Sequence, residues 1–369
     1  MRIARVLAVA KKEIIQIRRD PLSMALAFLL PLILLFIFGY AITMDIKNLK
    51  TVVCDLDKSE ASRRFSSDLI ASGYFTIVNP SVDYRDIERH LDSGVAKIAI
   101  TIPRGFSEDI RLGKPAQIQA LLDGSDANTA TIAAGYLSAA SDMFSAKLSP
   151  RRSAPAVDPR IRVWYNEELK SRNFIIPGLI AVIMSVIAAL LTSLTIAREW
   201  ERGTMEQLIA TPLKTPELLI GKLIPYFLIG FIDMLVAVSV TVFVFGVELK
   251  GSLALLLLVS AVFLFGVLSL GILVSIITKS QLPASQFALV ITFLPAFLLS
   301  GFMISTINMP YALQMITRIV PARYFVTIIK GIFLKGAGLD LILFDLSLLA
   351  VFGAAVFAVA NVKFKKKIV

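Results

Sequence analysis

The feature that most constrains the fold is a pair of long apolar runs separated by a short charged stretch. Residues 174–197 carry no charged side chain, and residues 223–247 carry only Asp233. A helix needs about 20 apolar residues to cross the hydrocarbon core of a bilayer, so each run predicts a membrane helix. Residues 198–222 are too charged to enter lipid and too short to form a domain. The sequence therefore predicts two spans joined by a charged loop.

The basic residues indicate how such spans would be oriented. Apolar residues make up 56% of the chain and the net charge is +11, a balance typical of an integral membrane protein. The bases gather just outside apolar runs, which follows the positive-inside rule and does not indicate a nucleic-acid partner. The clusters are Arg2, Arg5, Lys11, Lys12, Arg18 and Arg19, and Lys363, Lys365, Lys366 and Lys367. Both termini are therefore predicted to be cytoplasmic.

Apolar runs elsewhere predict a polytopic α-helical membrane protein with six spans. Residues 305–340 are excluded because Arg318, Arg323 and Lys330 interrupt them, and a charge at the centre of a span costs about 2.5–3.5 kcal/mol. We expect that segment to form two short re-entrant or interfacial half-helices on the outer side, breaking at residues 320–321. The predicted spans are residues 22–44, 174–197, 221–246, 252–277, 284–304 and 341–362.

Residues 45–172 have the composition of a soluble domain, which the predicted topology places outside the cytoplasm. Alternating strand and helix patterns predict a compact α/β domain inserted between the first two spans. We expect strands at residues 51–56, 74–78, 95–102 and 117–122, and helices at 59–72, 84–91, 106–112 and 126–148. A linker is expected at 149–159, followed by a candidate last strand at 161–165. In the rest of the chain, we expect residues 1–21 to form an amphipathic surface helix and residues 22–44 to form the first span. Residues 173–369 are expected to hold the other five spans.

The charged loop has a pattern of its own. Gly203 and Thr204 favour a sharp turn and a cap on a following short helix. Met205, Leu208 and Ile209 are expected to form an exposed apolar ridge beside charges of alternating sign. A purely solvated connector is the alternative reading. The chain has one cysteine, Cys54, and one histidine, His90, so we expect no internal disulfide, no His-built metal site and no catalytic triad.

Several segments together resemble one transporter family. Residues 198–208 (REWERGTMEQL), with Pro212 and Gly221-Lys222, are similar to the cytoplasmic loop signature of ABC-2 type transporter permeases. Residues 29–40, 173–178, 299–302 and 321–325 resemble other parts of the same family. The large domain after the first span is similar to that of the multidrug-efflux subgroup.

The resemblance implies a division of labour between this chain and a separate ATPase. No G-x-x-x-x-G-K-[ST] phosphate-binding loop occurs here, so ATP and Mg²⁺ would be bound by the partner and the chain would hold no cofactor and be no enzyme. The residues implied for coupling are Glu199, Glu201, Arg202, Gly203, Thr204, Met205, Glu206 and Leu208, within a loop at 198–220. Those implied for the connecting helix are Lys12, Glu13, Arg18 and Arg19, and for the outer re-entrant segment Pro321, Arg323 and Tyr324.

The function expected from this resemblance is export of an amphipathic or hydrophobic, drug-like or lipid-like substrate across a bacterial inner membrane. The partners would be an ABC ATPase, a second permease subunit in a homodimer or a paralogous heterodimer, membrane lipids, and a candidate periplasmic or envelope adaptor. A gradient-driven exporter using Asp233 as its proton site is the alternative. Asp233 as a protonated or paired carboxylate at a helix interface remains open as well, because intramembrane acids occur in both roles.

Overall fold

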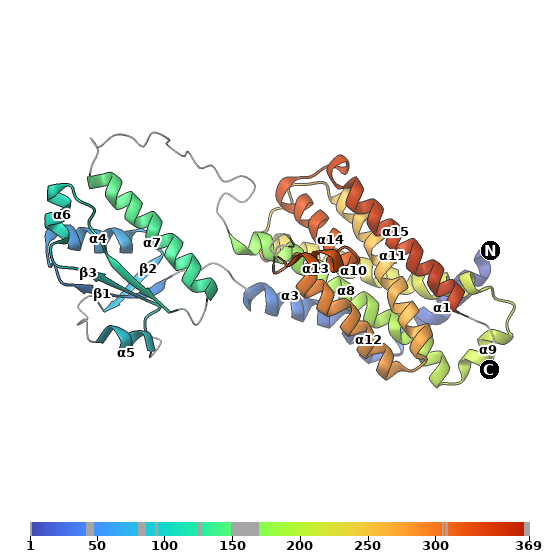
Figure 1. The fold of residues 1–369 in the computed structure, drawn as a ribbon. Coiled ribbons are helices and arrows are strands. Elements are labelled where there is room, and N and C mark those ends of the chain that lie inside the picture. The colour runs from blue at the N-terminus through green and yellow to red at the C-terminus, as the bar shows by residue number, and fades with distance from the viewer. Residues whose placement is uncertain are drawn as a thin grey trace. The chain divides into compact units, whose positions relative to one another are not determined.

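The structure is a computed structural model that describes residues 2–41, 48–79, 86–92, 95–123, 127–148, 170–304, 306 and 309–364. The chain divides into two compact units (Figure 1), each described here by itself. One unit combines Met1–Thr43 with Arg162–Val369, and the other is Met44–Ile161. The predicted linker at 149–159 and the candidate strand at 161–165 lie outside the described residues.

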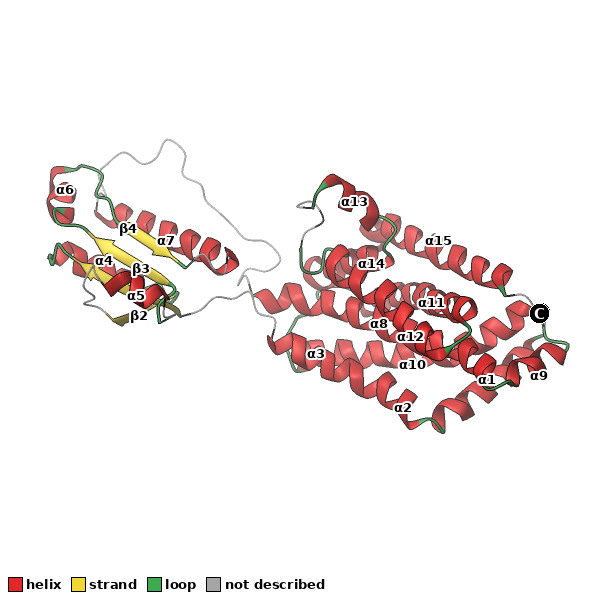
Figure 2. Cartoon of the chain, turned by 60° about the horizontal axis from the view of Figure 1, so that its bottom comes forward, coloured by secondary structure: helices red, strands yellow, loops and turns green. Residues whose placement is uncertain are grey.

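The secondary-structure elements described in the first unit are all helices, joined by loops (Figure 2). Its N-terminal portion holds α1 (Ile3–Arg18), α2 (Pro21–Met24), the π-helix η1 (Ala25–Leu29) and α3 (Leu30–Ala41). The remainder holds α8 (Ser171–Glu201), α9 (Thr204–Ala210), α10 (Thr215–Phe243), α11 (Leu253–Thr278), α12 (Gln281–Leu294), η3 (Pro295–Leu299), α13 (Tyr311–Thr317), α14 (Pro321–Lys330), η5 (Gly331–Lys335) and α15 (Leu339–Lys363).

Five of these helices are long and apolar enough to cross a membrane: α8, α10, α11, α12 continued by η3, and α15. Of the first predicted span, residues 22–44, the structure describes residues 22–41, which belong to α2, η1 and α3. Within η1 and α3, Ala27–Tyr40 forms a shorter apolar helix. The pair α13 and α14–η5 passes the same test only together, and it is bent by 86°. The expected break at residues 320–321 is confirmed, because α14 begins at Pro321, whereas the count of six spans stays a prediction.

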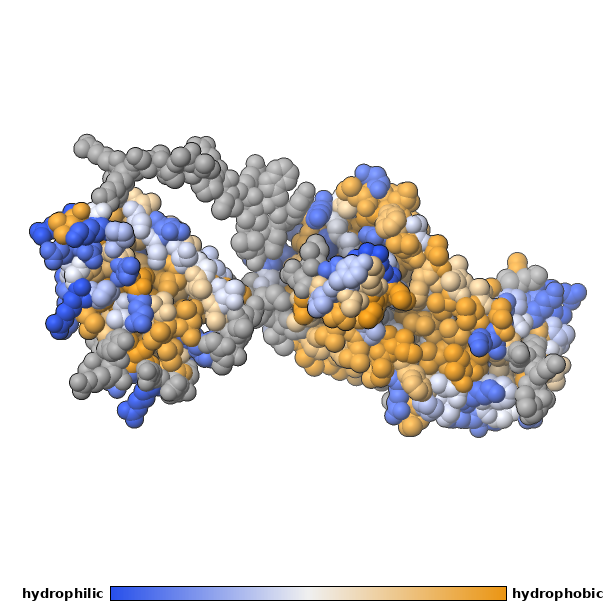
Figure 3. Space-filling view, viewed as in Figure 1, coloured by the Kyte–Doolittle hydropathy of each residue, from blue (hydrophilic) through white to orange (hydrophobic). Residues whose placement is uncertain are grey.

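Helix α8 forms the centre of this unit. Its most apolar window is 89% buried, compared with 17% for α15. Small residues allow the close packing: a Cβ atom on Gly271 of α11 would lie 2.4 Å from the Ala189 carbonyl of α8. Gly266 of α11 and Gly353 of α15 meet in the same way, as is common between membrane helices. Figure 3 shows a broad hydrophobic band on the visible face of this unit, with hydrophilic residues at the end that carries α1 and α9 and again around α13 and α14.

The second unit is built on a four-stranded sheet with the order β2-β1-β3-β4. Strands β1 (Leu49–Asp55), β2 (Phe75–Asn79) and β3 (Ile98–Ile102) are parallel, and β4 (Gln119–Leu122) pairs antiparallel with β3. The helices are α4 (Glu60–Ala71), α5 (Ile87–Asp92), α6 (Phe106–Leu112) and α7 (Ala127–Leu148). All four strands overlap their predicted ranges, and the helices follow in the expected alternation.

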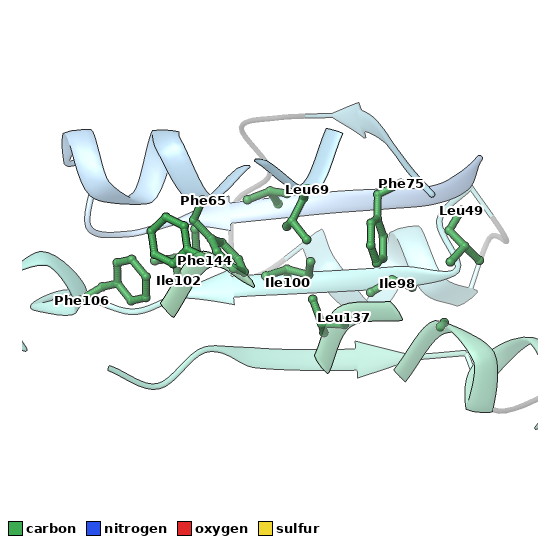
Figure 4. Close-up of a cluster of buried hydrophobic side chains, with 12 residues drawn as sticks. Leu49, Phe65, Leu69, Phe75, Ile98, Ile100, Ile102, Phe106, Leu137 and Phe144 are labelled. Atoms are coloured by element: carbon green, nitrogen blue, oxygen red, sulfur yellow. The ribbon is translucent and has the colours of Figure 1, made fainter. Parts of the chain in front are cut away.

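Side chains alternate between the two faces of this sheet, as strand geometry requires. On one face, isoleucines of β3 pack with Phe65 of α4, Phe106 of α6 and Phe144 of α7 (Figure 4). On the other, Val52, Cys54 and Ala99 pack against Ile87 of α5. Cys54 is therefore a buried apolar residue of β1, as its β-branched neighbours in the sequence suggest.

Candidate functional site

The charged loop between α8 and α10 folds into a turn followed by a short helix. Helix α8 continues to Glu201, and Gly203 then takes a positive φ of 68°. A residue with a Cβ atom is strained in that conformation, so glycine is favoured at this turn. Helix α9 begins at Thr204 and ends at Ala210, and α10 begins at Thr215. The sequence predicted both the turn at Gly203 and the short helix after it.

A buried cluster of three charges lies beside this turn. The ammonium of Lys222 is fully buried and lies 2.5 Å from Glu13 Oε1 and 3.3 Å from Glu199 Oε1. It also donates to the Thr195 carbonyl at 3.5 Å. Because each buried charge has a partner of opposite sign, the cost of removing these groups from water is offset. Glu13 belongs to α1, Glu199 to α8 and Lys222 to α10, so the cluster joins three helices.

Two further side chains, those of Lys12 and Thr204, contact the Glu199 carboxylate. Lys12 of α1, which is 44% exposed, forms an ion pair with Glu199 Oε1 at 2.5 Å. The hydroxyl of Thr204 donates to Glu199 Oε2, which connects the first residue of α9 to the last turns of α8. We name the group of Lys12, Glu13, Glu199, Thr204 and Lys222 the junction cluster. It links α1, α8, α9 and α10 at one point.

A second set of contacts holds α1 against the start of α10. Glu217 accepts hydrogen bonds from the backbone N–H of Arg2 at 2.8 Å and of Lys214 at 3.0 Å, and pairs with Arg5 at 3.5 Å. Gly221 permits close approach, because a Cβ there would lie 2.7 Å from Val9 Cβ and 2.9 Å from the Val6 carbonyl. Helix α1 therefore packs directly on α10.

Glu201 performs a different role from Glu199. Its carboxylate accepts hydrogen bonds from the Ser280 hydroxyl at 2.7 Å, the Gln281 backbone N–H at 2.8 Å and the Gln281 side-chain amide. These donors lie at the N-terminus of α12, where free N–H groups and the helix dipole favour an anion. Glu201 therefore connects the end of α8 to α12.

The structure divides the loop residues singled out from sequence into outward and inward groups. Arg202, Gly203 and Glu206 are exposed, together with Glu201, whereas Glu199 is 2% exposed. The expectation of an exposed ridge is wrong for Met205, which is 1% exposed and packs inward as the first apolar residue of α9; Leu208 is half-buried. The outward surface of α9 is thus mainly polar.

Helix α1, predicted as an amphipathic surface helix, buries one face of its side chains against the rest of this unit. The buried residues are Val6, Val9, Ala10, Glu13 and Ile17, whereas Leu7 and Ile14 are 58% and 42% exposed. Arg18 and Arg19 are exposed, and Lys12 lies at the edge. Sequence reasoning did not identify Lys222 and Glu217 as partners of α1. The available signal was Glu13, a carboxylate at helical spacing from the apolar residues on the buried face.

A cleft of about 900 Å³ opens beside the junction cluster, between α1, α8 and α12. Its walls combine the cations of Arg19, Arg198 and Arg202 with apolar side chains from Leu190, Leu194 and Leu282. Arg198 is held by an ion pair with Asp20 at 3.0 Å. The cleft therefore offers both polar and apolar contacts.

The residues of the bent helix pair serve mainly its own geometry. Pro321 occupies the first position of α14, where its missing N–H costs nothing. Arg323 donates to the Thr317 hydroxyl at 2.5 Å, and the Tyr324 hydroxyl donates to the Arg318 carbonyl at 2.6 Å. Both bonds cross the break between α13 and α14 and fix the bend.

Comparison with known proteins identifies the family. The model of a family described as ABC-2 family transporter protein matches residues 22–362. The chain is 40% identical over 336 residues to the probable multidrug ABC transporter permease YbhS of Escherichia coli K12, covering 90% of this chain and 89% of the relative. It is 30% identical over 359 residues to the probable multidrug ABC transporter permease YbhR of the same strain, covering 97% of each.

A third relative, the inner membrane transport permease YhhJ of Escherichia coli K12, is 28% identical over 326 residues, or 86% of this chain and 85% of the relative. With its apolar helices and these matches, the chain belongs to the ABC-2 family of transporter proteins. It is a multi-pass transmembrane permease, that is, a membrane component of a transporter.

Proposed function

We propose that this chain is the membrane subunit of an ATP-binding cassette exporter that moves an amphipathic or hydrophobic substrate out across the bacterial inner membrane. ATP and Mg²⁺ would be bound and used by a separate ATPase that docks on α9. The observation that carries the proposal is the junction cluster, because it fastens a short, outward-facing helix to three other helices through buried charges. A force applied to α9 is then transmitted directly into the bundle.

The contacts around α9 support a specific route for that force. A docked ATPase would contact the exposed Arg202 and Glu206, and movement of α9 would pull on Glu199 through Thr204. Glu199 and Lys222 would pass the movement to α1 and α10, while Glu201 would pass it to α12. Buried ion pairs suit this role because they resist separation, and truncating one partner costs about 3–5 kcal/mol.

The cleft between α1, α8 and α12 supports an amphipathic substrate. Its arginines would contact a polar group and its leucines an apolar one. We place it at the cytoplasmic side, together with α9 and both termini, which agrees with the basic clusters at the two ends of the chain. The exposed apolar residues Ile3, Leu7 and Ile14 of α1 would lie in the membrane interface.

Two copies of this chain, or this chain and a paralogue, would line the path. Helices α12 and α15 offer surface for lipid or a second subunit, since only 22% and 17% of their apolar windows are buried. The α/β unit would lie on the opposite side of the membrane from α9, where it could contact an envelope adaptor.

A charge-reversal experiment tests the docking role of α9. The double variant Arg202→Glu/Glu206→Arg changes two exposed residues, so we expect normal folding but loss of ATPase co-purification and of substrate-stimulated ATP hydrolysis. Asp340→Lys, an exposed charge at the start of α15, is the matched control and should behave as the wild type. Unchanged coupling in the double variant would remove the assigned role of α9.

A further inference from the structure

Asp233 is a buried acidic residue of α10 that lies outside the junction cluster. Asp233 is 7% exposed, and its Oδ2 atom has no hydrogen-bond partner among the described residues. A carboxylate withdrawn from water without a partner is costly, so such groups are rare unless they serve a site. Asp233 therefore requires an explanation that packing alone does not supply.

The carboxylate lies in a small apolar pocket. The pocket is enclosed by α3, α8, α10 and α11, with Leu35, Ile183, Met184, Ile187 and Leu264 among its lining residues. Tyr226, two turns before Asp233 on the same helix, carries the only other oxygen-bearing side chain among the described lining residues. One anionic group surrounded by hydrocarbon is the arrangement that suits an organic cation with apolar substituents.

Other ligands fit this pocket poorly. A metal cation such as Ca²⁺ takes six to eight oxygen ligands, whereas the pocket side chains provide one carboxylate and one phenol. An anionic ligand would be repelled by Asp233. We propose that Asp233 is the counter-ion for a lipophilic organic cation, whose charged centre pairs with the carboxylate while its apolar groups contact α3 and α8. This inference rests on the proposed export function and names a substrate class for it.

The pocket must widen to admit such a ligand, since its free volume here is about 20 Å³, room for about one water molecule. The helices around it contain the irregularities that make bending inexpensive. The π-helix η1 immediately precedes α3, and Pro31 lies in the first turn of α3. Pro225 lies inside α10, two turns before Asp233. Proline removes a backbone hydrogen bond and bends a helix, so α3 and α10 are able to separate next to the pocket.

The test is equilibrium binding of tetraphenylphosphonium to the full chain in nanodiscs, with neutral triphenylphosphine oxide as the comparison ligand. We expect the wild-type chain to bind the cation and Asp233→Asn to bind it at least about tenfold more weakly, because the charge pair is lost while the shape is kept. Binding of the neutral ligand should change less than about twofold. Asp233→Glu should retain most of the affinity for the cation. Asp345→Asn, a carboxylate on α15 outside this pocket, is the matched control and should bind as the wild type.

Equal affinity of the wild type and Asp233→Asn for the cation would overturn the inference. A second outcome would also overturn it: the wild-type chain does not bind the phosphonium, a proton gradient drives transport by this chain, and Asp233→Asn abolishes that transport. The carboxylate would then be a proton site. These outcomes are separate from the docking role of α9, because binding is measured without ATP or the ATPase. Failure of the Arg202→Glu/Glu206→Arg experiment would leave them unaffected.

Discussion

Lys222 and Asp233 are two buried charges on one helix, and their surroundings differ completely. They lie eleven residues apart on α10, which is three turns and therefore the same face. Lys222 pairs with two carboxylates from two other helices, whereas Asp233 Oδ2 lies in an apolar pocket and has no hydrogen-bond partner in the part of the chain that the structure describes. A buried charge that is paired within the chain, such as Lys222, fastens helices to one another. The buried carboxyl of Asp233, which lacks such a pair among the described residues, fits the proposed pairing with a ligand cation.

The largest expected effect is the loss of stability when the buried ion pairs of Lys222 are removed. Lys222→Met leaves Glu13 and Glu199 buried beside each other without their shared cation, and we expect it to destabilise the fold by about 3–5 kcal/mol. Lys12→Met removes only a partly exposed partner of Glu199 and should cost about 1 kcal/mol or less. Thermal unfolding scans of both variants in nanodiscs or detergent measure the difference in stability. Equal stability of the two variants would contradict the role of Lys222.

A triple variant separates stability from coupling. Glu13→Leu, Glu199→Leu and Lys222→Met together replace the three buried charges by apolar side chains. Apolar replacements of buried ion pairs are often neutral or stabilising by about 1–4 kcal/mol, so we expect the stability lost in Lys222→Met to return. Substrate-stimulated ATP hydrolysis should still be lost, because Thr204 no longer has the Glu199 carboxylate that ties α9 to the cluster. Full recovery of both properties would show that the charges serve folding alone.

Replacing Asp233 is expected to change stability in the opposite direction from replacing Lys222. Asp233→Leu removes an unpartnered buried carboxyl from an apolar pocket, so it should leave stability unchanged or raise it by about 1–2 kcal/mol. The same thermal scan used for Lys222→Met provides the measurement. A loss of stability comparable to that of Lys222→Met would show that Asp233 has a structural partner, which would remove the contrast between the two residues.

The sequence allowed much of the architecture to be predicted, for identifiable reasons. Residues 174–197 and 223–247 are continuous apolar runs of spanning length, and the α/β alternation is marked by β-branched residues and glycines at element ends. The turn at Gly203 was predicted because a positive φ strongly favours glycine. These signals are local, so no knowledge of distant contacts was needed.

The site was harder to predict because its partners lie far apart in the chain. Lys222 meets Glu13 across 209 positions, and helical periodicity alone does not specify which helices pack together. The same difficulty explains the error at Met205, which lies between Thr204 and Glu206 in a polar stretch of the sequence but is 1% exposed in the fold. Glu13 on the apolar stripe of α1 was a usable signal, since an acidic residue there requires a buried partner.

The smallest expected effect concerns a carboxylate that has partners and lies near the surface, in the α/β unit. Asp57 accepts hydrogen bonds from the backbone N–H groups of Gly105 at 2.9 Å and Ser107 at 3.2 Å, which caps α6. The side chain of Ser59 contributes most to lowering its pKa below 3.8, followed by Ser107 and Gly105. A lowered pKa means that this stabilisation is complete above about pH 3.8 and is lost as the pH falls through the pKa of the folded state.

Asp57→Ala should therefore weaken the start of α6 by about 1 kcal/mol at neutral pH, a typical value for a lost helix cap. Hydrogen exchange of residues 105–112 in the full chain measures this, and an increase of about fivefold is expected from that free energy. Lys147→Ala breaks the exposed pair with Asp68 and should leave exchange at α6 unchanged. Equal protection of α6 in Asp57→Ala and the wild type would mean that a partnered charge contributes to this fold only when it is buried, which would restrict the comparison to residues such as Lys222.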